Sequence, residues 1–407
     1  MSRPDLLQRR EHQIQLLQGS KEFFPALIEA VDLARVEVRL ETYIFDFTGT
    51  SAGVAQALER AAQRGVTVQL VVDGVGTGTF PPEWRERFDR AGVQWRVYAP
   101  LGPLGYLLPS RWRRLHRKLC VVDGLVSFCG GINILDDLHD PNYGTLMLPR
   151  LDFAVRASGM LVQEMRDTMA LLWWRLQAVR DTRQRNFPAA LSSLRTAAGY
   201  LHGTQGSARN GADDVHFAEA LLLLRDNVHH RSKIERAYRK AIGEARQEII
   251  IANAYFVPGR KLRRALKMAA QRGVKVQLLL QGKYEYFMQY HAARPVYGAL
   301  LAAGVEIYEY SASFLHAKVA VVDGHWVTVG SSNLDPLSLL LAREANVVVN
   351  DAGFAADLRA RLVRAMDNGG QRVDAALYAS RPWRQRLRDR IAFGLMRAAL
   401  FVTGYRY

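Results

Sequence analysis

The sequence predicts an α/β protein made of two tandem domains, each a mixed sheet flanked by helices, related by pseudo-two-fold symmetry with an active site at their interface. Two observations support this prediction: a polar motif occurs twice at a separation of 200 residues, and the segments around it also repeat. A chain of 407 residues suits two domains of about 150 to 200 residues better than a single core. With 49% hydrophobic residues, each half can bury a core of its own.

The repeat extends well beyond the motif. Residues 61–70 recur as residues 269–278 with one difference, Thr67 against Lys275. The pattern predicts the end of an amphipathic helix, a glycine that caps it, and an alternating strand. Flanking segments repeat in the same order, with predicted strands at 36–40 and 248–252, followed by Tyr43 and Tyr255, and further helix ends with strands at 91–93 and 303–305. Each half is therefore strand, helix, strand, helix, strand and motif, which favours helices covering a largely parallel sheet.

We place the first domain at residues 1–199, a linker at 200–214, the second domain at 215–380 and a basic amphipathic tail at 381–407. The polar stretch 180–214 contains several glycines and arginines and predicts loops between the domains. A period near 200 residues indicates a domain duplication, because solenoid repeats are only about 20–50 residues long.

The repeated motif has the composition that phosphodiester chemistry needs. Its copies are His116, Lys118, Asp123, Gly130 and Asn133, and His316, Lys318, Asp323, Gly330 and Asn333. In each copy the His and Lys alternate on one face of a predicted strand. One neutral His can attack phosphorus and form a phosphohistidine, while the other, protonated, gives its proton to the leaving alkoxide and then activates the acceptor. No metal or cofactor is required.

The remaining motif residues have supporting roles in this hypothesis. Lys118, Lys318, Asn133 and Asn333 hold the phosphoryl oxygens and stabilise the charge of the transition state. The Gly130-Gly131 and Gly330-Ser331 pairs bring backbone N–H groups to the phosphate, and Ser331 adds a hydroxyl that Gly131 lacks. Asp123 and Asp323 are included as catalytic residues, with tying the turn of the motif in place as the alternative.

Each histidine also needs a partner that fixes its tautomer. Asp152 and Glu344 occupy equivalent places after the two motifs, and each opens an apolar strand. We expect them to orient the histidines, with a buried structural ion pair as the alternative.

The motif resembles the signature of the phospholipase D superfamily, HxKxxxxD followed by a Gly and an Asn. Residues 250–259 and 330–338 are similar to bacterial cardiolipin synthases of the shorter type without N-terminal membrane spans. The resemblance covers about residues 14–350 and implies phosphatidyl transfer from one phosphatidylglycerol to another, giving cardiolipin and glycerol. In such enzymes the N-terminal histidine, here His116, is often the nucleophile. The symmetry of the motif leaves this assignment open.

Charge and apolar patterning predict contact with a membrane surface from one side. Lys and Arg number 55 against 39 Asp and Glu, a formal net charge of +16 that attracts polyanions. The loop 103–114 and the tail 381–407 combine apolar and basic residues, as interfacial elements do. No signal peptide and no apolar run long enough to span a bilayer is recognisable. We expect a peripheral protein on the cytoplasmic side of the inner membrane, with phosphatidylglycerol and the anionic surface as partners.

Other functions compete with this hypothesis. A hydrolase, or a transferase with another acceptor alcohol, would use the same residues, because only the exclusion of water separates them. A nuclease of the superfamily would also be basic, but the basic residues here lie among aliphatic clusters rather than beside stacking aromatics, so nucleic acid is not the expected partner. A noncatalytic scaffold is disfavoured because no His or Lys of the motif is lost. Cys120 and Cys129 are expected to be reduced thiols in or beside a strand.

Overall fold

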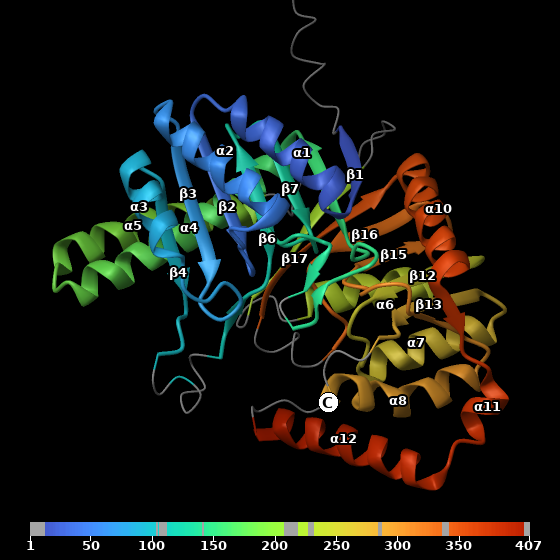
Figure 1. The fold of residues 1–407 in the computed structure, drawn as a ribbon. Coiled ribbons are helices and arrows are strands. Elements are labelled where there is room, and N and C mark those ends of the chain that lie inside the picture. Colours follow the sequence, from blue (N-terminus) through green and yellow to red (C-terminus); the bar gives the residue numbers. More distant parts are fainter. Residues whose placement is uncertain are drawn as a thin grey trace, which may run out of the picture. The chain divides into compact units, whose positions relative to one another are not determined.

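The computed structural model describes residues 13–102, 105, 112–140, 142–206, 219–226, 232–283, 287–335 and 342–402. The chain divides into two compact units, Met1–Asp136 with Val155–Leu222 and Asp137–Ala154 with Leu223–Tyr407 (Figure 1). The first half of the chain contains β1 (Ile14–Gln18), α1 (Gly19–Asp32), β2 (Glu37–Thr42), α2 (Ala52–Gln63), β3 (Thr67–Asp73), α3 (Pro82–Ala91), β4 (Gln94–Tyr98), β5 (Arg114–Leu115), β6 (Lys118–Val122), β7 (Val126–Gly130), β8 (His139–Asp140), β9 (Gly144–Thr145), β10 (Phe153–Ser158), α4 (Met160–Arg183) and α5 (Phe187–Gly206).

The second half follows a similar order of strands and helices. Its elements are β11 (Glu219–Arg225), α6 (Lys233–Glu244), β12 (Glu248–Asn253), α7 (Arg260–Gln271), β13 (Lys275–Gln281), α8 (Phe287–Leu301), β14 (Glu306–Tyr310), β15 (Lys318–Val322), β16 (Trp326–Gly330), β17 (Ala342–Asn350), α10 (Ala352–Gly369), β18 (Gly370–Arg372), α11 (Ala375–Ala379) and α12 (Trp383–Val402). No described helix has the length and apolar character needed to cross a membrane.

Each unit contains a mixed sheet. In the first, the strand order is β1-β10-β7-β6-β2-β3-β4, with β2, β3 and β4 parallel and β6 antiparallel to both β2 and β7. In the second, the order is β11-β17-β16-β15-β12-β13-β14-β18, again with three parallel strands beside antiparallel motif strands. The mixed α/β fold is confirmed, but the expectation of a largely parallel sheet was wrong.

The motif strands are antiparallel because each copy forms a hairpin. Asp123 and Gly124 have φ of +52° and +65° between β6 and β7, and Asp323 and Gly324 have +49° and +67° between β15 and β16. Consecutive left-handed residues, with glycine second, form the tight turns that join antiparallel strands. A hairpin of this kind cannot contribute two parallel strands.

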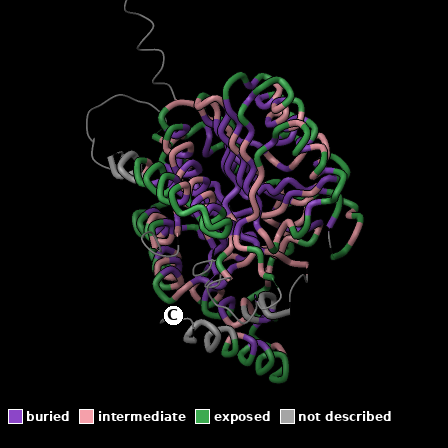
Figure 2. Tube along the Cα trace, turned by 90° about the vertical axis from the view of Figure 1, so that its left-hand side faces the viewer, coloured by how far each residue is buried: buried purple, intermediate pink, exposed green. Residues whose placement is uncertain are grey.

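The repeated helix, cap and strand are present in both units. Helix α2 ends at Gln63, Gly65 has φ of +88°, and β3 begins at Thr67, while α7 ends at Gln271, Gly273 has φ of +89°, and β13 begins at Lys275. Both helices bury one face, with Leu58 and Leu266 fully inaccessible. Figure 2 shows the strands largely buried and the helices exposed on their outer sides. The cysteines are buried free thiols in β6 and β7, as expected.

The stretch 180–214, expected to be loop-rich, is helical up to Arg183 and again from Phe187 to Gly206, with a short turn at 184–186. Its first residues end α4, and α5 then packs along α4. Ala and Leu within α5 have high helix propensity, and packing against α4 overrides the cost of its glycines. The proposed linker 200–214 thus begins inside α5, and 207–214 lie outside the described residues.

Candidate active site

In both copies the motif lysine bends back onto its own histidine. Lys118, 5% exposed at the start of β6, donates from Nζ to the backbone oxygen of His116 at 2.7 Å. Lys318, fully buried at the start of β15, makes the same bond to the backbone oxygen of His316. The ammonium group therefore fixes the backbone at the histidine and places a positive charge beside that residue. A buried positive charge beside a histidine suits a reaction whose transition state carries negative charge.

His316 is held by a carboxylate from the first half of the sequence. Its Nδ1 lies 2.6 Å from Oδ2 of Asp152, whose side chain is only 4% exposed against 22% for the histidine. Leu151 and Leu315 form a parallel bridge that brings Asp152 beside His316, with the backbone N–H of His316 donating to the Leu151 oxygen at 2.9 Å. With Nδ1 engaged by a carboxylate, any proton transfer between His316 and a substrate has to use Nε2.

The segment that carries Asp152 is fixed within the second unit by further contacts. Arg150 pairs with Asp140 at 2.9 Å, and Ser313 Oγ donates to the Leu148 oxygen at 2.6 Å. Residues 137–154 accordingly cluster with the second unit although they follow the first motif in sequence. The acidic residue after the first motif thus serves the histidine of the second.

Two positioning residues were missed in the sequence. Asp73, fully buried at the end of β3, accepts the backbone N–H of Leu115 at 2.7 Å. Gln281, at the end of β13, accepts the backbone N–H of Leu315 at 3.0 Å. Each therefore fixes the residue immediately before a motif histidine. The repeat could have identified these two residues as a pair, because positions 73 and 281 differ by the same 208 residues as the recurring segments 61–70 and 269–278.

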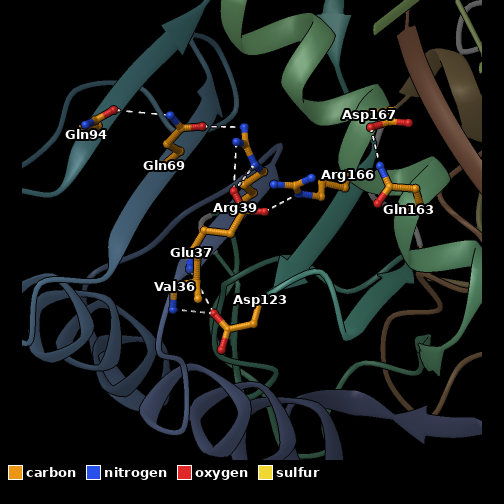
Figure 3. Close-up of polar contacts among 9 residues, drawn as sticks. All are labelled: Val36, Glu37, Arg39, Gln69, Gln94, Asp123, Gln163, Arg166 and Asp167. Carbon is orange, nitrogen blue, oxygen red and sulfur yellow. Dashed lines mark hydrogen bonds and ion pairs between the residues drawn. The ribbon is translucent and has the colours of Figure 1, made fainter. Parts of the chain in front are cut away.

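Asp123 and Asp323 do not belong with the reacting groups. The Asp123 carboxylate accepts backbone N–H groups of Arg35 at 2.8 Å, Val36 at 2.8 Å and Glu37 at 2.9 Å. Figure 3 shows the contacts with Val36 and Glu37. Asp323 accepts three equivalent donors ahead of β12 at 2.8, 2.8 and 2.9 Å. They lie at the far end of the motif strand from the histidines, and five strand residues span about 16 Å. We therefore correct their assignment from catalytic to structural.

These bonds also set the charge state of the two aspartates. Burial by itself raises the pKa of each carboxyl, but the three backbone donors outweigh burial and leave both pKa values below their ordinary value. Each aspartate is therefore an anion that ties the motif turn to the strand beside it.

Ser331 was expected to present its hydroxyl to phosphate, and this expectation was wrong. Ser331 is fully buried, its Oγ donates to Oε2 of Glu344 at 2.5 Å, and its N–H donates to the Ala345 oxygen at 3.0 Å. The hydroxyl and the amide are both used internally. Ser331 instead fixes Glu344, which is itself fully buried.

Gly330 is required for packing rather than for an open backbone amide. A Cβ at this position would lie 2.3 Å from the Asn346 side chain and 2.5 Å from the Ala345 oxygen. Strand β17 thus passes too close to β16 for any side chain here.

The two asparagines have different surroundings. Asn133 is 8% exposed, and its Oδ1 accepts the Ile44 N–H at 3.2 Å, which leaves the amide nitrogen as its donor end. Asn333 is 2% exposed, and its Oδ1 has no hydrogen-bond partner among the described residues. Phosphate binding by these residues stays a prediction.

An aromatic ring accompanies the first histidine. The Tyr43 ring lies 5.0 Å from the His116 ring between centroids, and Lys118 Nζ lies 5.5 Å from the Tyr43 centroid. Gly76 lies against this tyrosine, since a Cβ there would come within 2.9 Å of two of its ring carbons. The tyrosine therefore has a fixed place beside His116.

This ring has no counterpart at the equivalent position of the second copy. The bridges of Phe45 and Phe256 to the segments after their motifs align the two halves at an offset of 211 residues. Tyr43 then corresponds to Ala254, and Tyr255 is one position out of register with it. The apparent match of the two tyrosines in the sequence was misleading.

A buried ion pair also distinguishes the copies. Arg117 Nε and Nη2 donate to the two carboxylate oxygens of Glu41 at 2.5 and 3.0 Å, with both residues almost inaccessible. At the equivalent positions the second unit has Ala317 and Ala252, both fully buried. The backbone scaffold is thus common to the copies, while the side chains behind the histidine differ. Residues 103–104 and 106–111, in the predicted membrane loop, lie outside the described residues.

Known proteins are similar to this chain over both halves. The family model of the cardiolipin synthase, phospholipase D-like domain matches residues 27–150 and 238–366, one region in each half. Cardiolipin synthase B of Escherichia coli K12 is 36% identical over 397 residues, covering 98% of this chain and 91% of that protein. Cardiolipin synthase A of Cronobacter sakazakii is 30% identical over 390 residues, covering 94% and 74%.

Solved structures share the fold at low sequence identity. Phosphatidylserine synthase of Haemophilus influenzae superimposes with a TM-score of 0.64 at 13% identity, over 96% of this chain and 94% of that one. Polyphosphate kinase of Porphyromonas gingivalis has a TM-score of 0.56 at 15% identity, over 95% and 53%.

Proposed function

The chain belongs to the family of cardiolipin synthases built from phospholipase D-like domains, and we propose that it transfers a phosphatidyl group from one phosphatidylglycerol to another. The products are cardiolipin and glycerol. The observation that carries this proposal is the 2.6 Å contact between Asp152 and Nδ1 of His316, beside the buried Lys318. Its relatives with cardiolipin synthase names match almost the full length of the chain.

The proposed reaction proceeds in two steps, with each histidine taking one role. Neutral His116 attacks phosphorus of the first phosphatidylglycerol, so that a P–N bond forms as the P–O bond to glycerol breaks. The departing glycerol oxygen takes the proton from Nε2 of protonated His316. Neutral His316 then takes the proton of a hydroxyl on the second phosphatidylglycerol, whose oxygen attacks the phosphohistidine and releases His116.

The assignment of the acid rests on Asp152. A carboxylate at Nδ1 stabilises the imidazolium form, which is the form that carries a proton to the leaving group. His116 is then the nucleophile, in agreement with what the resemblance to this family implies. The expected orienting role of Glu344, whose Oε2 accepts the Ser331 hydroxyl, stays a prediction.

The two lysines and two asparagines would stabilise the phosphoryl oxygens. Each lysine Nζ is fixed by the histidine backbone, so little reorganisation is needed when charge develops. We also propose that the protein acts at the cytoplasmic face of the membrane as a peripheral protein. The net charge of +16 supports attraction to the anionic surface where phosphatidylglycerol resides.

The test is product analysis with labelled phosphatidylglycerol in anionic vesicles, with labelled DNA in a parallel reaction. Cardiolipin together with released glycerol supports the transferase. Phosphatidic acid instead of cardiolipin would make the protein a hydrolase, and another phosphatidyl alcohol would change the acceptor. Cut DNA with untouched lipid would indicate a nuclease.

The roles of the histidines need a second experiment. His116→Ala and His316→Ala should each abolish turnover while keeping the melting temperature of the wild type. Brief incubation of His316→Ala with lipid labelled in the phosphatidyl group should leave label on His116. Label on His316 in the His116→Ala protein would reverse the two roles.

A further inference from the structure

Helix α12 carries an apolar stripe that points away from the protein. Trp383, Leu387, Ile391 and Leu395 recur at every fourth residue and are 63%, 48%, 54% and 58% exposed. Residues four apart lie on one helix face, so the four side chains form a continuous row. They line a groove of about 400 Å³, and all of its lining residues in the described part of the chain come from α12. We call this row the α12 stripe.

The opposite face of α12 fixes the helix to the second unit. Asp389, 3% exposed, contacts Nδ1 of His291 on α8 at 2.8 Å and Nη1 of Arg381 at 3.1 Å. Phe393 packs against the core of this unit. Surface helices of globular proteins normally turn their apolar side to the core and their charged side to water. Here a buried carboxylate anchors the helix, and the apolar row faces outward.

The charges around the α12 stripe have one sign. Arg384 and Arg388 line the groove with the stripe, and Arg386 and Arg390 are exposed on the same helix. The single acidic residue between 381 and 402 is Asp389, which is buried in its contacts with His291 and Arg381. The accessible surface of this helix is therefore apolar and cationic, with no accessible carboxylate among its described side chains.

We propose that the α12 stripe is the surface by which this chain lies on an anionic phospholipid bilayer. The four apolar side chains enter the boundary between headgroups and acyl chains, and the arginines remain at the level of the lipid phosphates, their stems along the apolar surface. Tryptophan is favoured at this depth because one part of its ring is apolar and one polar. The inference rests on the proposed function for its choice of phosphatidylglycerol as the anionic lipid.

A second copy of the chain fits this surface less well. Two α12 helices packed through their stripes would bring Arg384 and Arg388 of each copy together, which like-charge repulsion opposes. A bilayer containing phosphatidylglycerol offers an apolar interior and a continuous layer of negative charge, so it satisfies both components of the surface.

The experiment is vesicle flotation of the full chain with the double variant Leu387→Glu/Ile391→Glu. Both positions are about half exposed and outside the anchoring face, so the fold should tolerate them. The matched control is Leu125→Glu, which places the same substitution on a 69% exposed leucine of the first unit. Vesicles of phosphatidylglycerol in phosphatidylcholine are compared with phosphatidylcholine alone, and circular dichroism and melting temperature confirm folding.

We expect the double variant to bind phosphatidylglycerol vesicles at least about tenfold more weakly, because carboxylates at this depth are costly, with the control unchanged. Cardiolipin formation on those vesicles should fall in parallel, while turnover in dispersed detergent–lipid micelles should match the wild type. If the double variant does not fold, Leu387→Ser/Ile391→Ser takes its place in the same assay.

Unchanged vesicle binding in a folded double variant would overturn the proposal. A wild-type dimer that becomes monomeric in the double variant would also overturn it, because the α12 stripe would then be a contact between copies. So would a protein ligand that occupies the α12 stripe in place of vesicles. Stripe-dependent vesicle binding by a wild type that makes no cardiolipin would refute the proposed function and leave the docking surface intact.

Discussion

The reassignment of Asp123 and Asp323 can be tested by replacing each with asparagine. Asparagine keeps the shape of the side chain but has one acceptor oxygen where aspartate has two. Its best orientation keeps the oxygen that receives two backbone N–H groups and turns its NH₂ toward the third donor, the N–H of Arg35 or Arg246. The substitution therefore removes one hydrogen bond and places two donors face to face. It also makes the acceptor oxygen of the other two bonds neutral.

The size of the effect follows from these contacts. A hydrogen bond to a charged group contributes about 1.5–3 kcal/mol, and the two remaining bonds weaken by roughly 0.5 kcal/mol each when the acceptor becomes neutral. We expect each variant to lose about 2–4 kcal/mol of unfolding free energy, or roughly 4–16 °C in melting temperature for a unit of this size. The two copies have nearly identical distances, so the two losses should be similar.

The assay combines thermal unfolding with steady-state turnover of phosphatidylglycerol at a temperature where both variants are folded. A structural role predicts a kcat within about threefold of the wild type, because the residue does not touch the reacting atoms. A kcat that falls by orders of magnitude with an unchanged melting temperature would refute the reassignment and restore the aspartates to the catalytic set.

The pH dependence gives an independent check. The folded pKa of each aspartate lies below its ordinary value, so its contribution is fully present above the unfolded pKa, about 3.9, and is lost as the pH falls through the folded pKa. The stability difference between wild type and variant should therefore be constant from pH 6 to 8 and shrink below about pH 4. A difference that grows on acidification would contradict this reasoning.

Three further predictions concern the surroundings of the two histidines. Asp152→Asn leaves His316 without an anionic partner, and we expect kcat to fall about 10²- to 10⁴-fold with vesicle binding unchanged, measured by initial rates across pH. Glu41→Ala strands the buried charge of Arg117 and should lower the unfolding free energy by about 3–5 kcal/mol in urea titrations, whereas the double replacement by alanine should recover most of it. Tyr43→Ala removes the ring beside the first histidine and should lower kcat about 10- to 100-fold in the same lipid assay, while Tyr43→Phe should be nearly neutral.

Each of these has a result that would contradict it. A normal kcat in Asp152→Asn would remove the basis for assigning His316 as the acid. Additive losses in the Glu41 and Arg117 variants would mean that the two groups do not act as a pair. Equal losses in the phenylalanine and alanine variants of Tyr43 would assign its role to the hydroxyl instead of the ring.

The local part of the fold could be predicted from the sequence, because it depends on neighbouring residues. The capping glycine at position 65 and its counterpart at 273 mark helix ends through their left-handed backbone, and both appear in the repeated segment. The expectation that His116 and Lys118 share one strand was wrong, because β6 begins at Lys118 and the histidine lies two residues before it. The direction of the motif strands was missed, although Asp123-Gly124 is a recognised hairpin signal.

The orientation of the carboxylates could not be predicted in the same way. Asp152 contacts a histidine 164 positions away, through a bridge between Leu151 and Leu315. Nothing in the local pattern around Asp152 distinguishes its own motif from the other one. The burial of Ser331 was also hidden, because a serine beside a motif glycine has the same sequence whether its hydroxyl faces substrate or a buried glutamate.

The two copies agree in some features and differ in others, and the division has a chemical meaning. Both keep the contacts that fix the backbone at the histidine: the lysine bond to its carbonyl, the acceptor for the preceding N–H, and the three-donor aspartate at the turn. They differ beside and behind the histidine, where the first copy has Tyr43 and the Arg117–Glu41 pair and the second has three alanines. Backbone placement must be the same if both rings are to approach one phosphorus, whereas a nucleophile and a proton donor need different electrostatic surroundings. A duplication that conserves the backbone placement and varies the electrostatic surroundings is what two histidines with different roles require.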